Sequence, residues 1–246
     1  MLRHRIIFVL TFFEGVLFRT KLFNPDYRYT ANFIDTWSID EIIMLDISRE
    51  KKYKNSFFKI INKFAKECFV PLSVGGGIRN IDDAKAYLDN GADRVVLNTG
   101  ALINNKLVFN LAKKYGSQCV IASIDAKKNE NNFQVFSHSG VKNTRKRVND
   151  WALELEKLGA GEIMLNSIDH DCSLLGYDLN LCKLVSSAVN IPVLICGGAG
   201  NWSHFSDAIK IGGADAVCTT NIYHFSETSI KSAKKFLNHQ KILVRT

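Results

Sequence analysis

"VGGGI" at residues 74–78 is a glycine turn that occurs a second time, as "CGGAG" at residues 196–200, 122 positions later. Two further pairs of segments repeat at offsets of 122 and 121: "GADRVV" (91–96) with "GADAVC" (213–218), and "EIIMLDIS" (41–48) with "EIMLNSID" (162–169). A constant offset of this kind indicates an internal repeat. The sequence therefore predicts two similar halves, roughly residues 1–115 and 116–246.

Short apolar, β-branched runs alternate with segments of helical periodicity along all 246 residues. In one such segment Phe57, Ile60, Ile61 and Phe64 follow the i, i+3, i+4, i+7 spacing of a buried helix face. Eight strand–helix units of about 30 residues each match the repeat of a TIM barrel. We therefore predict a single (β/α)8 barrel domain over residues 1–246, since a doubly wound open sheet gives no reason for the repeat. The expected strands are Arg5–Thr11, Glu41–Asp46, Pro71–Val74, Arg94–Asn98, Cys119–Asp125, Glu162–Asn166, Val193–Cys196 and Ala216–Thr220.

The composition is that of a globular protein with a large core, at 46% apolar and 23% charged residues. The net charge of +8 raises the possibility of nucleic-acid binding. However, the basic clusters "KKYK" (51–54) and "TRKR" (144–147) are short and lack the interleaved aromatic platforms on which bases stack, since Tyr53 is the one aromatic residue in them; this favours a small anionic ligand.

The six cysteines show no CxxC pair and no histidine at metal-ligand spacing. The apolar run near the N-terminus ends at Glu14 without a cleavage site, and no run reaches the roughly 18 residues of a membrane span. We expect a reduced cytoplasmic protein without a metal, a cofactor, membrane insertion or bound nucleic acid.

Catalytic groups in a TIM barrel project from the C-terminal ends of the strands. The two glycine turns follow the third strand of each half, where backbone N–H groups can approach phosphate oxygens. The segments "LNTG" (97–100) and "TTNIYHF" (219–225) follow the next strand of each half and are expected to start short helices aimed at the same anions. Two matched sites of this kind predict a ligand with a phosphate at each end.

Two acidic and two basic residues open strands, and therefore face the opposite, N-terminal mouth of the barrel: Arg5, Glu41, Arg94 and Glu162. At one level of inward positions they would form a salt-bridged plug. Such a plug has two interpretations: ordinary structural charges, or a gate for a molecule that passes through the barrel.

Many motifs occur in the order found in the HisF family, the cyclase subunit of imidazole glycerol phosphate synthase, which the chain resembles over nearly its whole length: "RII", "LDI", "VGGGIR", "GADRVVLNT", "GSQCV", "IDAK", "GAGEI", "SIDHD", "GYD", "GGAG" and "YHF". The resemblance implies a barrel that receives ammonia from a HisH-like glutaminase at its N-terminal face. In that family the ammonia crosses the barrel and closes the imidazole ring of a bis-phosphorylated ribulosyl-formimino nucleotide.

The resemblance also implies roles for individual positions. The ammonia gate would be Arg5, Glu41, Arg94 and Glu162, with Arg94 where the family usually has lysine, and Asp93 and Gln118 would contact the glutaminase. One phosphate site would consist of Gly77, Asn98 and Thr99, and the other of Asp171, Gly198, Thr220 and Asn221.

The chain departs from the family at the catalytic end. The family uses a carboxylate at the ends of strands one and five as acid and base; Asp125 retains the second, whereas Thr11 replaces the first. A hydroxyl cannot exchange a proton near neutral pH, and loss of acid–base catalysis costs about 10²–10⁴-fold. Arg19 replaces a family lysine with a group that keeps its proton. Around the second phosphate site, Cys172 stands where the family has glycine, and Cys196 and Asn221 stand where it has serine.

Two hypotheses follow. The first is an ammonia-conducting subunit for acetamidino-group formation on a surface sugar, serving an adenylating sugar amidotransferase, with weak cyclase activity or none. The second is a true cyclase of histidine biosynthesis in which Asp46 or Asp169 transfers the proton. A sugar-phosphate isomerase on the same barrel fits poorly, because those relatives also rely on an acid at each half's first strand.

Overall fold

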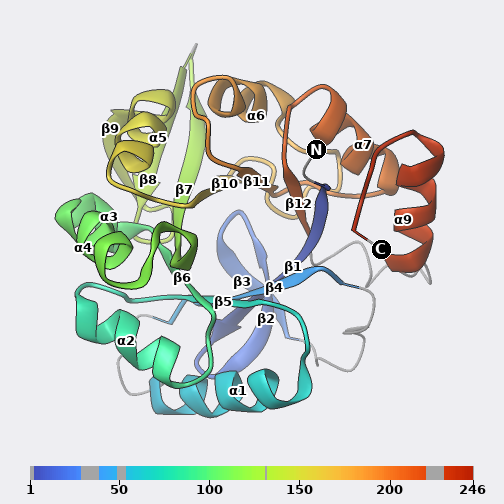
Figure 1. Ribbon diagram of the computed structural model, residues 1–246. Coiled ribbons are helices and arrows are strands. Elements are labelled where there is room, and N and C mark those ends of the chain that lie inside the picture. Colours follow the sequence, from blue (N-terminus) through green and yellow to red (C-terminus); the bar gives the residue numbers. More distant parts are fainter. Residues whose placement is uncertain (1–2, 29–38, 49–53, 131, 220–229, 246) are drawn as a thin grey trace.

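The computed structural model describes residues 3–28, 39–48, 54–130, 132–219 and 230–245. Eight parallel strands pair in sequence around a closed barrel, since β1 pairs with both β4 and β12, and β7 pairs with both β6 and β10 (Figure 1). The predicted (β/α)8 fold is thus confirmed. The barrel strands are β1 (Arg5–Phe13), β4 (Glu41–Asp46), β5 (Leu72–Gly75), β6 (Arg94–Leu97), β7 (Val120–Asn129), β10 (Glu162–Ser167), β11 (Val193–Cys196) and β12 (Ala216–Thr219).

The helices form a layer around the outside of the barrel (Figure 1). Helix α1 buries Phe57 and Ile61 on the face that the periodicity predicts. Helix α2 begins where the side chain of Asn80 accepts the backbone N–H of Asp83 at 2.8 Å, a standard N-cap. No helix in the described part of the chain is long and apolar enough to span a membrane. The described α-helices are α1 (Lys54–Glu67), α2 (Ile81–Asp89), α3 (Thr99–Ile103), α4 (Lys106–Tyr115), α5 (Val148–Lys157), α6 (Leu179–Ser186), α7 (Trp202–Lys210) and α9 (Ile230–His239), with a 3₁₀ turn, η3, at Ser117–Cys119.

The first barrel strand of each half continues into an antiparallel hairpin. β1 turns back into β2 (Val16–Lys21) and β3 (Asn24–Arg28), and β7 turns back into β8 (Asn132–Ser137) and β9 (Lys142–Arg147). The hairpins were not among the predicted elements, although Glu14–Gly15 carries a recognisable signal. Both residues have positive φ, 53° and 76°, as a two-residue type I′ turn requires.

The two hairpins meet over the C-terminal mouth. The backbone N–H of Phe23, at the tip of the first, donates to Asp171 Oδ2 at 2.9 Å. The same tip packs on the second hairpin. The Phe23 ring lies so close to Gly140 that a Cβ added there would be 3.2 Å from the ring. The mouth is therefore a partly roofed cavity.

The inner wall of the barrel forms a small apolar cluster, separate from the larger core between strands and helices. Its residues are Ile7, Val9, Ile43, Val96, Ile121, Met164, Leu194, Ala216 and Cys218. Polar residues occupy the levels above and below this cluster.

The first glycine turn makes a stability test possible. Gly76 has φ +122°, and an added Cβ would lie 2.3 Å from the Asp46 carbonyl oxygen, whereas Gly77 has φ +62° and open space around it. We expect Gly76→Ala to lower the free energy of unfolding by about 2–4 kcal/mol, through strain and a backbone clash. Gly77→Ala should cost only about 1–2 kcal/mol. Urea denaturation of both variants checks this, and equal losses would contradict it.

Candidate functional site

A cavity of about 820 Å³ opens at the C-terminal ends of the strands. This volume is within the range of small-molecule sites. The cavity brings together polar residues from both halves and both hairpins, among them Thr11, Arg19, Asp46, Asn98, Asp125, Asn166 and Asp171.

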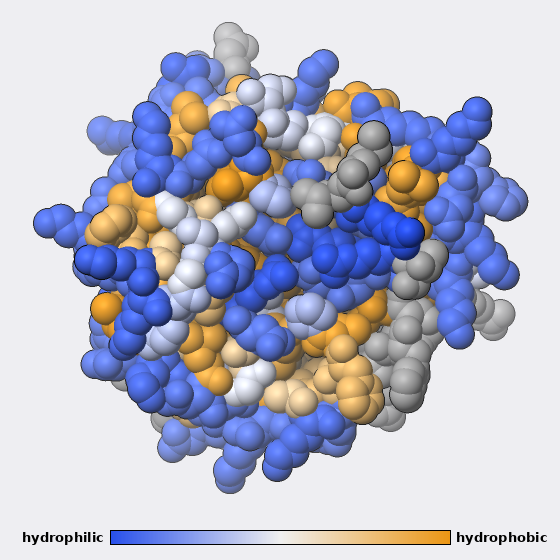
Figure 2. Space-filling model, viewed as in Figure 1, coloured by the Kyte–Doolittle hydropathy of each residue, from blue (hydrophilic) through white to orange (hydrophobic). Residues whose placement is uncertain are grey.

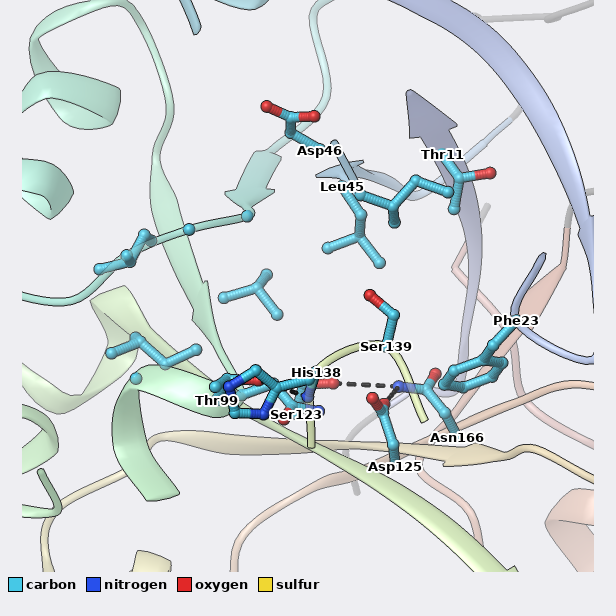
Figure 3. Close-up of a pocket in the computed structure, with 18 of the residues that line it drawn as sticks. Thr11, Phe23, Leu45, Asp46, Thr99, Ser123, Asp125, His138, Ser139 and Asn166 are labelled. Carbon is cyan, nitrogen blue, oxygen red and sulfur yellow. Dashed lines mark hydrogen bonds between the residues drawn. The ribbon is translucent and has the colours of Figure 1, made fainter. Parts of the chain in front are cut away.

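Asp125 lies at the centre of this polar group and is only 7% exposed. Asn166 Nδ2 donates to Asp125 Oδ1 at 2.9 Å and also lies 3.0 Å from Ser123 Oγ (Figure 3). Burial raises the pKa of Asp125 to about 7, against the opposing effect of amide hydrogen bonds from Asn166 and Asn98, while Asp171 adds to the rise. Asp125 can therefore gain or lose a proton near neutral pH.

Thr11 lines the same cavity, but its hydroxyl is already engaged. It donates to the carbonyl oxygen of Phe18 on β2, and Figure 3 shows it pointing away from Asp125. Arg19, one residue further along β2, is ion-paired with Asp26 across the hairpin. The end of β1 thus contributes a hydrogen-bonding hydroxyl, and β2 contributes a fixed positive charge.

The carboxylate whose negative charge adds to the raised pKa of Asp125 is Asp171, a residue predicted only as a phosphate ligand. Its own pKa is raised, chiefly by burial, against hydrogen bonds from the Phe23 N–H and the Thr20 side chain. Asp46 instead accepts the Ser48 N–H at 2.9 Å, on the far side of the cavity in Figure 3. Asp169 accepts the Lys128 N–H at 3.0 Å.

The two predicted phosphate sites differ in access. Gly77, Asn98 and Thr99 all line the cavity. Thr99 Oγ1 also accepts the N–H of His138 from the tip of the second hairpin, at 3.0 Å.

In the second site, Asp171 lines the cavity, while Gly198 packs against the loop after β10. The Gly176 N–H donates to the Gly198 carbonyl at 2.8 Å, and a Cβ on Gly198 would lie 2.0 Å from the Gly176 oxygen. Thr220 and Asn221 lie outside the described residues.

At the opposite end of the barrel the four strand-opening charges form a closed ring. Arg5 lies 2.9 Å from both Glu41 and Glu162, and Arg94 lies 3.3 and 3.2 Å from the same two glutamates. The Glu41 side chain is fully buried. Burial raises the pKa of Glu162, against the opposing effect of both arginines. Figures 1 and 2 look onto this end, where β1 begins, and Figure 2 shows a band of strongly hydrophilic residues across its centre.

Asp93 and Gln118 lie beside this ring, along a surface hollow of about 790 Å³ that Arg94 also lines. The rim of the hollow includes Phe69, whose side chain is 83% exposed.

A family model described as "Histidine biosynthesis protein" matches residues 9–229, from the middle of β1 to beyond β12. The match thus includes the cavity and three of the four ring residues. Within the described residues no group of three or more His, Cys, Asp or Glu side chains could hold a metal ion.

The raised pKa of Asp125 predicts a pH dependence of stability. The unfolded-state pKa of Asp is about 3.9, so the folded state binds the proton more tightly. This stabilisation is fully present below about pH 4 and is lost as the pH rises through the folded value of about 7.

Asp125→Asn removes this titration. We expect the stability of the variant relative to the wild type to increase between pH 4 and pH 8, by up to about 4 kcal/mol for a shift of this size. Chemical denaturation across that range measures it, and Asp26→Asn, at an exposed position, is the control. A constant difference between Asp125→Asn and wild type would contradict the raised pKa.

Proposed function

Because the chain belongs to the histidine biosynthesis protein family, we propose that it is a HisF-like barrel subunit with a changed acceptor. In this proposal it receives ammonia from a glutaminase at the N-terminal face and delivers it for acetamidino-group formation on a surface sugar. The observation that carries the proposal is the end of β1, where the Thr11 hydroxyl is bound to the Phe18 carbonyl.

The ring supports the entrance of the route. Its four side chains close the lower end of the barrel through alternating charges, so each glutamate has both arginines as partners. Removing one partner from a buried ion pair costs about 3–5 kcal/mol, because the other charge is left uncompensated. A docked partner that displaces one arginine would open the lumen, and the hollow beside Arg94, with Asp93, Gln118 and Phe69, is where we place that partner.

The wall above the ring supports passage of a neutral molecule. It is the apolar inner cluster, interrupted by Ser73, a buried hydroxyl for which the described residues provide no hydrogen-bond partner. An apolar wall favours ammonia over ammonium, because an unpaired buried charge costs several kcal/mol or more.

The mouth supports an acceptor that is activated elsewhere. An adenylating amidotransferase supplies its own leaving group, so nitrogen transfer to its substrate does not need the paired acids that close an imidazole ring. The open site at Gly77, Asn98 and Thr99 leaves room for a phosphorylated ligand.

One observation favours the alternative, an imidazole glycerol phosphate synthase cyclase. Asp171 and Asp125 line one cavity, and Asp171 contributes to the raised pKa of Asp125, which gives the mouth a second carboxylate despite Thr11. In this alternative Asp171, rather than Asp46 or Asp169, would transfer the second proton.

A cyclase assay with concentrated ammonium at high pH, which needs no glutaminase, separates the two functions. We expect turnover of the ribulosyl nucleotide at least about 10²-fold below that of an ordinary cyclase, and a gain in Thr11→Asp, because a positioned acid contributes about 10²–10⁴-fold. Ordinary turnover in the wild type that is abolished by Asp171→Asn would establish the alternative instead.

The gate is tested by comparing two nitrogen sources. Glu162→Gln removes one charge from the ring and leaves Glu41 to hold both arginines. We expect glutamine-driven product formation by the complex with its glutaminase to fall about tenfold, while ammonium-driven formation is unchanged. Glu156→Gln on α5 is the matched control. Equal loss with both nitrogen sources would contradict a gating role.

A further inference from the structure

Two cysteines lie next to each other in the wall of the barrel. Cys196 ends β11 and Cys218 is on β12, and the two are paired in the strand register. Both pack with the inner apolar cluster, and the Cys196 thiol is near enough to contribute to the raised pKa of Cys218, which is caused chiefly by burial. Both are free thiols.

The register alone brings this pair within bonding reach. Neighbouring strands lie about 4.7–4.9 Å apart, and a disulfide needs a Cα–Cα separation of about 4.4–6.8 Å. Side chains of registered residues project to the same face of the sheet. Gly197, with φ +94°, follows Cys196 directly, so the end of β11 has backbone freedom to adjust.

The two thiols differ in access. Cys196 is partly exposed and lines the large cavity, whereas Cys218 is 1% exposed behind it. An accessible thiol beside a sheltered one can react first, and the second can then resolve the adduct. Burial raises the pKa of Cys218, so we expect the resolving step to be slower than with an exposed thiol.

The pair also lies between the two charged sites of the barrel. Successive register pairs lead from the mouth to the ring, through Asp125, Asn166, Cys196, Cys218, Ile7 and Glu41. Cys196 is therefore one strand away from Asn166, whose amide holds Asp125. A bond between the thiols would act on the cavity through this neighbour.

We propose that Cys196 and Cys218 form a redox-active dithiol that converts to a cross-strand disulfide. A small disulfide RSSR is attacked by Cys196, which releases one RSH and leaves a mixed disulfide. Cys218 then attacks this sulfur and releases the second RSH, so the two thiols lose two electrons and two protons and RSSR becomes two thiols. This site goes beyond the proposed ammonia route and does not depend on it.

Two other cysteines serve as internal controls. Cys172 is partly exposed near the same mouth. Its pKa is raised, chiefly by burial, while Arg19 lowers it and Asp171 raises it. Cys182 is buried in α6, where burial raises its pKa to about 12, as burial also raises that of Cys218; unlike Cys218, Cys182 has no cysteine opposite it in a strand register. We expect neither Cys172 nor Cys182 to form the cross-link.

The experiment treats the intact protein with bis(2-hydroxyethyl) disulfide, alkylates the remaining thiols, and maps the peptides without reduction. We expect one cross-link, between the peptides that contain residues 196 and 218. Cys218→Ala should stop the reaction at a mixed disulfide on Cys196, and Cys196→Ser should leave Cys218 free. Cys182→Ser should leave the cross-link unchanged.

Three outcomes would overturn the proposal. They are full alkylation of both residues after prolonged treatment, a cross-link to Cys172 formed at least as fast, and a Cys218→Ala variant that gathers no more mixed disulfide than wild type. Circular dichroism of each variant shows that it is folded, and Cys218→Val replaces the alanine variant if that one is unfolded.

Discussion

The alternating ring of Arg5, Glu41, Arg94 and Glu162 is the interaction on which the organisation of the molecule depends. Four different barrel strands supply its members, so the ring forms only when the barrel is closed. Its buried charges are tolerable because Glu162 has two arginine partners and Glu41 has three, Arg245 being the third. The ring blocks one end of the lumen, and the ligand cavity is consequently at the other end. The N-terminal face of the barrel therefore presents paired charges, and the C-terminal face presents the cavity.

The two halves share a backbone plan but differ in their chemistry at the mouth. Each half's first strand continues into a hairpin, yet one strand presents Thr11 at its end and the other Asp125. The first hairpin offers a carbonyl oxygen, that of Phe18, at the position where Thr11 donates. A carboxylate could not donate to that oxygen and would be repelled by it. Thr11 thus fits its local surroundings, because its hydroxyl supplies the proton that the Phe18 carbonyl accepts.

Sequence reasoning located the strands and the strand-opening charges because both follow from local pattern. Apolar runs fix where each strand begins, and a charge at that position must lie at the N-terminal end of the barrel. The hairpins were missed because "FFEGVLF" (12–18) reads as one apolar run unless Glu14–Gly15 is recognised as a turn. Contacts across strands, such as Asn166 with Asp125 and Cys196 with Cys218, depend on the register of the closed barrel. No local spacing in the sequence encodes that register.

The charge states at the two ends of the lumen explain why its wall can be nearly apolar. At the lower end Glu41 and Glu162 are both paired with Arg5 and Arg94, and Glu41 also lies 3.4 Å from Arg245, so both carboxylates are compensated. At the upper end burial raises the pKa of Asp125, so its protonated form is accessible near neutral pH. The amides of Asn166 and Asn98 favour the ionised form and oppose this rise. On the proposed route, ammonia that has passed the ring crosses this apolar wall before it reaches Asp125, a group that can exchange a proton near neutral pH.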